Sequence, residues 1–170
     1  MNLYEEIYKL KTIERKGWLS RNCHSKEGRV ESDAEHTFSM AILALEIMSK
    51  EKMDLDQEKV LKMILYHEIC EIDYGDHTPM EKISPAEKFE HEYQAVKRIA
   101  DSYEMPEILG LWLEFEENKT PEAQFVKKVD KLDAMMQSKI YADVVEDETV
   151  FREFCDSRPE ISGEFQEYLK

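Results

Sequence analysis

Glycine, proline and cysteine are all scarce in this 170-residue chain, which contains five Gly, five Pro and three Cys. Because tight turns depend on glycine and proline, their scarcity disfavours a turn-rich β architecture and allows long uninterrupted helices. Cys23, Cys70 and Cys155 are odd in number and far apart, without the spacing of a disulfide framework or a paired zinc motif. We therefore expect three free thiols.

Long apolar runs are also missing. No segment approaches the roughly 20 apolar residues of a membrane-spanning helix, and the N-terminal stretch MNLYEEIYKLKTIERKGW lacks the apolar centre of a signal peptide. Hydrophobic residues make up 42% and charged residues 36% of the chain, which is typical of a folded protein. These features predict a cytoplasmic protein with no membrane partner.

Positive charge is in deficit, because 38 acidic side chains stand against 23 Lys and Arg and give a formal net charge of −15. Such a surface repels the phosphate backbone, which disfavours binding of a nucleic acid polymer. A small anionic substrate is still allowed, since a bound cation can reverse the local field. Neither a Gly-rich phosphate loop nor a nucleophilic Ser or Cys motif is present.

Apolar residues recur at helical spacing along most of the chain. We predict an all-α helical bundle that forms a single domain over residues 1–170, with its core at about 10–145 and short helices over 148–170. The predicted helices cover 3–13, a segment from Ser32 or Asp33, 55–72, 85–103, 106–117 and a long segment from Thr120 and Pro121, with a polar loop over 16–32. Apolar side chains expected to face the core include Phe38, Leu65 and Ile140.

Four potential metal ligands lie on these predicted helices. His36 occurs in AEHTFSMA, His67 and Glu68 adjoin in ILYHEICEIDYGD, and Asp130 occurs in FVKKVDKLDAMM. Two imidazoles and two carboxylates suit a divalent ion such as Mn, Co, Fe, Mg or Zn. An ion that accepts six ligands would keep positions for water and for a phosphate oxygen.

Each of these residues also has an ordinary interpretation. A single His on an apolar helix is usually a hydrogen-bonded core residue, and an Asp flanked by lysines is usually a surface ion pair. The joint pattern favours a metal site, because His67 and Glu68 lie between apolar residues and an unpartnered buried charge is costly.

The four residues resemble the H…HD…D signature of HD-domain phosphohydrolases, and the chain is most similar to the HD-domain 5′-deoxynucleotidases. The resemblance runs from about Leu10 to Tyr141 through LKTIERKGWLSRN, SDAEHTFSMA, YHEICEIDYGD and FVKKVDKLDAM. It implies an HD-type bundle in which one divalent metal ion is held by His36, His67, Glu68 and Asp130. It also implies a phosphomonoesterase that releases phosphate from deoxynucleoside 5′-monophosphates, and a homodimer.

One position departs from the family pattern, since the doublet is normally His-Asp and is His-Glu here. The extra methylene of Glu68 moves the carboxylate by roughly an ångström, a scale at which ligand placement matters. We expect this change to affect which metal binds and how fast the reaction runs.

Three further residues acquire roles only through the resemblance. It implies that Glu71 is the catalytic acid or base, that Asp76 contacts the sugar hydroxyl, and that Trp18 packs against the deoxyribose and disfavours a 2′-hydroxyl. Glu71 follows Glu68 by three residues and would share its helix face. The ordinary alternatives are a solvated surface Glu, a turn Asp and a Trp in a loop that covers the core.

The phosphate contact and the outer partners of the site stay open at this point. Related bacterial enzymes have a phosphate-binding basic residue immediately before the Trp, whereas this chain has Gly17 there, with Arg15, Lys16 and Arg21 nearby. Asp73 and His77 are candidate outer partners.

Two rival functions remain. One is an HD phosphodiesterase or pyrophosphohydrolase acting on another phosphorylated metabolite, and the other is a non-catalytic scaffold with a structural metal. A structural metal would need neither Glu71 nor Asp76.

Overall fold

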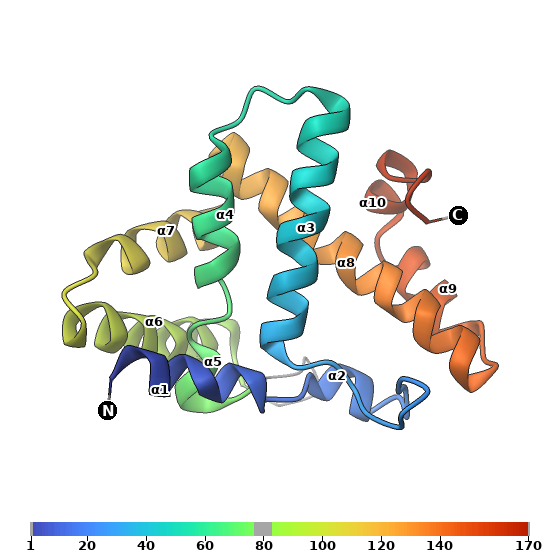
Figure 1. The fold of residues 1–170 in the computed structure, drawn as a ribbon, viewed down its shortest axis with the longest axis horizontal. Coiled ribbons are helices and arrows are strands. Elements are labelled where there is room, and N and C mark those ends of the chain that lie inside the picture. Colours follow the sequence, from blue (N-terminus) through green and yellow to red (C-terminus); the bar gives the residue numbers. More distant parts are fainter. Residues whose placement is uncertain (1, 77–82, 170) are drawn as a thin grey trace.

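The computed structural model describes residues 2–76 and 83–169, and every regular element in those ranges is a helix (Figure 1). The predicted all-α fold is thereby confirmed. The elements in chain order are α1 (Leu3–Ile7), the 3-10 helix η1 (Tyr8–Lys11), α2 (Lys16–Leu19), α3 (Asp33–Glu51), α4 (Gln57–Tyr66), α5 (Glu71–Tyr74), α6 (Pro85–Ser102), α7 (Pro106–Glu117), α8 (Pro121–Val145), α9 (Thr149–Asp156) and α10 (Pro159–Glu164).

Three helices from distant parts of the chain form the centre of the fold. In Figure 1, α3 and α4 stand side by side, and α8 passes behind α3 toward α9 and α10. Each of α3, α4 and α8 contacts the other two, and their facing side chains form a core that includes Met40, Ile47, Met63, Ile64 and Leu132. Each such side chain contributes about 1.5–3 kcal/mol by leaving water. The core therefore fixes the relative positions of the three helices.

Local capping signals explain where three long helices begin. The Ser32 and Ser84 hydroxyls each accept a hydrogen bond from the backbone N–H three residues on, and a Glu at that position accepts one in return. Thr120 caps α8, and Pro121 follows in its first turn. The starts predicted at these positions are confirmed. The start at Ser32 places His36 near the N-terminal end of α3.

The helix predicted over residues 55–72 is wrong in its second half. Helix α4 ends at Tyr66, residues 67–70 form a turn, and α5 starts at Glu71. The His67 side chain donates from Nδ1 to the carbonyl oxygen of Ile64 (2.6 Å) and so competes for an acceptor of the last helical turn. The following backbone bonds run over three residues, as from Glu71 N to Glu68 O. Glu71 therefore follows Glu68 by one tight turn of backbone and not along a regular α-helix.

The N-terminal segment also differs from its prediction. The helix expected over 3–13 is divided into α1 and η1, and the polar loop expected over 16–32 starts with the one-turn helix α2, which contains Trp18. Backbone bonds from Arg15 N to Glu31 O and from Asp33 N to Ile13 O join this segment to the start of α3. As a result Arg15 and Trp18 lie beside the N-terminal end of α3.

Three apolar side chains that we expected in the core are exposed instead. The exposed fractions are 69% for Phe38, 57% for Leu65 and 56% for Ile140. Phe38 and Leu65 border an apolar groove of about 450 Å³ on the outer side of α3 and α4, which Leu3, Ile7 and Met105 also line. Helical spacing alone did not separate this groove from the core.

Two expectations drawn from absences can be compared with the structure. Cys23, Cys70 and Cys155 are free thiols, as predicted. Among the described helices, none is long and apolar enough to cross a membrane.

Candidate metal centre

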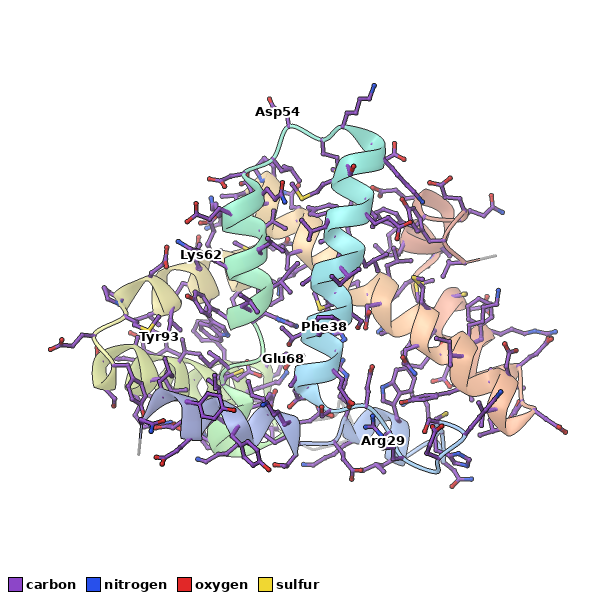
Figure 2. The ribbon with its side chains drawn as sticks, viewed as in Figure 1. Arg29, Phe38, Asp54, Lys62, Glu68 and Tyr93 are labelled. Atoms are coloured by element: carbon purple, nitrogen blue, oxygen red, sulfur yellow. The ribbon has the colours of Figure 1, made fainter. Side chains whose placement is uncertain are left out.

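The proposed ligands come together where α3, α8 and the turn after α4 meet. Figure 2 shows Glu68 just below the end of α4, beside the lower half of α3. His36 Nε2 lies 4.0 Å from Glu68 Oε1 and 3.2 Å from Asp130 Oδ1, and His67 Nε2 lies 3.5 Å from the same Glu68 oxygen. His36, His67 and Glu68 thus form one cluster, and Asp130 adjoins it at His36. The structure brings three of the predicted ligands around one point and places the fourth beside them.

The two histidines are oriented by hydrogen bonds on their other ring nitrogens. His36 donates from Nδ1 to Asp133 Oδ2 (2.7 Å), and His67 donates from Nδ1 to the Ile64 carbonyl. Since a carboxylate and a carbonyl can only accept, each Nδ1 carries a proton, which leaves each Nε2 as the ring nitrogen that faces the ligand cluster. Metal-binding histidines are held in this way by outer partners.

The donor set fits a divalent cation. Both Nε2 atoms are buried; that of His36 lies 3.2 Å from Asp130 Oδ1, and that of His67 has no hydrogen-bond partner in the described part of the chain. The ligand atoms of His36, His67 and Glu68 all lie within 4.8 Å of one another. A buried imidazole nitrogen without a partner, such as that of His67, is costly unless something binds it. A metal ion between these nitrogens and the carboxylates would satisfy all of them.

The charged residues at this centre shift one another's pKa values. Burial and Arg15 would both lower the pKa of His36, yet hydrogen bonds to Asp130 and Asp133 outweigh them and raise it to about 10. The pKa of Asp130 is held well below its ordinary value, because His36 outweighs the cost of burial. Burial lowers the pKa of His67. Without a metal the cluster thus takes up a proton on His36, and a cation would take over that charge.

Arg15 adds a buried cation to the centre. Its Nη1 donates to Glu68 Oε1 at 3.0 Å, and its Nε lies 3.6 Å from Glu31 Oε1. Burial would lower the pKa of Arg15, but the charges of Glu68 and Asp130 raise it above its ordinary value. Arg15 therefore stays charged and holds the Glu68 carboxylate toward the histidines.

Glu71 is buried beside the ligands, with only 5% of its surface exposed, which excludes the surface alternative. Its Oε2 atom has no hydrogen-bond partner among the described residues. Burial, together with the charges of Glu68 and Asp33, raises the pKa of Glu71 to about 9. At neutral pH this carboxyl group holds a proton, which it could transfer to a neighbouring group.

A pocket of about 230 Å³ opens next to Asp130 and contains both predicted substrate contacts. Asp76 accepts a hydrogen bond from the backbone N–H of Lys16 (2.5 Å). Trp18 is 3% exposed and donates from its indole to Glu31 (2.8 Å). The residues that line the pocket are Arg15, Gly17, Trp18, Arg21, Asp76, Asp130, Lys131, Ala134, Phe154 and Arg158.

The outer partners suggested by the sequence do not belong to this centre in the described residues. Asp73 pairs with Arg98 of α6, with its Oδ2 2.7 Å from Nε. His77 lies outside the described residues.

Comparisons with known proteins identify the family to which the chain belongs. The profile of the HD domain family matches residues 7–168 of the chain. The chain belongs to the HD domain family. It is 33% identical to the 5′-deoxynucleotidase HDDC2 of Dictyostelium discoideum over 153 residues, which cover 83% of this chain and 78% of that protein. It is 30% identical to the human 5′-deoxynucleotidase HDDC2 over 154 residues, 89% of this chain and 72% of that protein.

A solved structure gives the same result for the fold. The PH0347 protein from Pyrococcus horikoshii OT3 superposes with a TM-score of 0.76 and 30% identity, over 98% of this chain and 94% of that chain. The HD-type fold inferred from the motifs is thereby confirmed.

Three residues of this HD domain site were missed by reading the sequence. Asp133, which orients His36, follows Asp130 by three residues in DKLDA, and that spacing could have revealed it. Phe154 and Arg158 line the pocket from beyond the recognised motifs, and no local signal marks them.

Proposed function

We propose that this HD domain protein is a divalent-metal-dependent 5′-deoxynucleotidase, which hydrolyses deoxynucleoside 5′-monophosphates to deoxynucleosides and phosphate. The observation that carries the proposal is the position of Asp130. It belongs to the ligand cluster and also to the wall of the pocket that holds Trp18 and Asp76. The relatives from Dictyostelium discoideum and Homo sapiens are both named 5′-deoxynucleotidases, which supports the same substrate class.

The metal in this proposal is one divalent ion held by His36, His67, Glu68 and Asp130. When bound, it supplies Lewis acidity that polarises the phosphoryl group and lowers the pKa of a water molecule. Mn, Co, Fe, Mg and Zn all accept mixed nitrogen and oxygen ligands, so metal analysis of the purified protein decides among them. The longer side chain of Glu68 reaches the centre from a turn and is steadied there by Arg15.

Arg15 is the proposed phosphate contact. It lines the pocket and lies next to a metal ligand, which neither Gly17 nor Arg21 does. The planar donor fork of arginine matches phosphate oxygens.

Three other residues complete the proposed reaction. Glu71 carries a proton at neutral pH and gives it to the leaving 5′-oxygen of the nucleoside. Asp76 accepts a hydrogen bond from the sugar hydroxyl, and its own position is fixed by the Lys16 backbone. Trp18 forms a rigid wall against C2′ of the sugar, because its ring packs between Tyr141 and Phe154.

A phosphate-release screen tests this proposal. The substrates are deoxynucleoside 5′-monophosphates, the matching ribonucleotides, cyclic nucleotides, nucleoside triphosphates and sugar phosphates, each tested with protein stripped by a chelator and reloaded with one ion. We expect deoxynucleoside monophosphates to give the highest kcat/KM and the stripped protein to be inactive. Preferred hydrolysis of a cyclic diester or a pyrophosphate would favour the rival HD hydrolases. Metal binding without any hydrolysis would favour the structural scaffold.

The chain as a whole is proposed to act as one domain and to form a homodimer. Helices α9 and α10 pack on α8, and Phe154 of α9 lines the pocket. The apolar groove bordered by Phe38 and Leu65 is the proposed dimer surface, since apolar patches of this kind mark interfaces. Light scattering of the protein and of Phe38→Glu tests this assignment. The expected cytoplasmic location remains a prediction, to be tested by cell fractionation.

A further inference from the structure

The outer wall of the pocket is an arginine held on an aromatic ring. The rings of Phe154 and Trp18 stack with their centroids 4.9 Å apart. The guanidinium of Arg158 lies over the Phe154 ring, 5.3 Å from its centroid, and that of Arg21 lies 5.4 Å from it. Such cation–π contacts fix a guanidinium plane in space. Arg158 is therefore a positioned wall of the pocket and not a freely moving surface side chain.

Arg158 differs from the other arginines of the pocket in its partners. Arg21 pairs with Glu153 at 2.8 Å, and Arg15 pairs with Glu68 at 3.0 Å. No carboxylate lies within salt-bridge distance of Arg158 in the described ranges, where its side chain donates to the Ser157 hydroxyl (2.9 Å). The charge of Arg158 contributes to lowering the pKa of Glu153, but that carboxylate is bonded to Arg21. An arginine that lines a pocket without a direct salt bridge keeps donors for a ligand.

The order of residues along the pocket shows which part of a nucleotide reaches Arg158. Asp130 and Ala134 both line the pocket from α8 and are one helical turn apart, about 5.4 Å. Ala134 packs in the same cluster as Trp18 and Phe154. With the phosphate at Asp130 and the sugar on Trp18, the base extends past Ala134 to Phe154 and Arg158.

We infer that Arg158 is a specificity-determining residue that recognises the 6-oxo edge of a purine base. This inference rests on the proposed deoxynucleotidase function. A guanidinium has five donors and no acceptor. It pairs with N7 and O6 of a 6-oxopurine, whereas adenine presents an amino donor at the same position. The enzyme therefore prefers 6-oxopurine over 6-aminopurine deoxynucleotides.

The sharpest test compares deoxyinosine and deoxyadenosine 5′-monophosphates, which differ at the C6 substituent and the protonation of N1. For the wild type we expect kcat/KM to favour the 6-oxo substrate by on the order of tenfold. Arg158→Ala should bring this ratio to within about twofold. Arg158→Lys keeps the charge but loses the donor fork, so it should lower the ratio in the same way.

Arg152→Ala is the matched control, because Arg152 lies on α9 near Phe154, is exposed and pairs with Glu148 outside the pocket. It should leave the ratio unchanged.

Equal kcat/KM for both substrates in the wild type would overturn the inference while leaving the deoxynucleotidase function intact. An equal loss for both substrates in Arg158→Ala, with recovery in Arg158→Lys, would also overturn it, because Arg158 would then contact phosphate. Hydrolysis of neither substrate by metal-loaded wild type would instead refute the proposed function. Thermal unfolding and metal content of each variant show that the fold is kept.

Discussion

Replacing Glu71 with Gln should make the metal-free protein more stable and the enzyme slower. The buried Glu71 carboxyl has a pKa of about 9 in the folded chain, against an ordinary value of 4.5. Between these pH values the folded chain binds a proton that the unfolded chain does not. The free energy of unfolding of the wild type therefore falls as the pH rises through this window. Gln cannot ionise, so the free energy of unfolding of the variant does not fall with pH through this group.

The size of the stability difference follows from the interval between the pH of the measurement and the ordinary glutamate pKa of 4.5. One pH unit corresponds to about 1.4 kcal/mol, so at pH 7.5 the wild type is destabilised by up to about 4 kcal/mol relative to the variant. For a chain of this length, 1 kcal/mol shifts the melting temperature by about 2–4 °C. We expect Glu71→Gln to melt up to about 8–16 °C higher at pH 7.5, with a smaller difference at pH 5.5.

Thermal unfolding by circular dichroism, in chelator and over a series of pH values, measures this difference. Glu90→Gln is the control, since it removes the same charge from the exposed side of α6. In the metal-loaded enzyme, Glu71→Gln should lower kcat by about 10²–10⁴-fold with the metal retained. A variant no more stable than the wild type at pH 7.5 would refute the reasoning about burial. Unchanged turnover with metal retained would remove Glu71 from the mechanism, and loss of the metal would make it a ligand.

Three more predictions concern the ligands and the pocket. His36→Ala and Asp130→Ala should each abolish metal binding and activity. The melting temperature of these variants should no longer rise with added metal. Full activity of the chelated wild type would contradict this prediction. Asp133→Asn should weaken metal binding by about 10–100-fold in a chelator competition assay, because it loosens the hold on His36. Trp18→Ala should reduce the preference for deoxynucleotides over ribonucleotides in kcat/KM, whereas an unchanged ratio would show that another residue excludes the 2′-hydroxyl.

Those parts of the fold that depend on local signals could be predicted from the sequence. Ser32, Ser84 and Thr120 each bind the backbone within three residues, so the helix starts were visible in short stretches of sequence. The end of α4 could not be predicted in this way, because it depends on which backbone carbonyl accepts the hydrogen bond from the His67 ring. The exposure of Phe38 could not be predicted either, since an apolar groove and a core share the same spacing.

The same distinction applies to the site. The proposed ligand set was visible because the motif residues are adjacent or recognisable by their neighbours, and the structure clusters His36, His67 and Glu68 with Asp130 beside His36. The burial of Glu71 was not visible, because it results from packing against elements far away in sequence. Arg158 was missed for a related reason: its importance comes from a ring contact with Phe154 and from the pocket that both border.

The separation of the ligands from the outer pocket wall has a consequence for engineering. Every proposed metal ligand precedes Asp133 in the chain, whereas Phe154 and Arg158 come after the end of α8 at Val145. The pocket-lining positions Phe154 and Arg158 can therefore be varied without changing the ligands, whereas Ile161 and Phe165 of the same segment belong to the main core. Selectivity for one nucleobase could be changed by substitutions at Phe154 and Arg158 while the metal ligands stay the same.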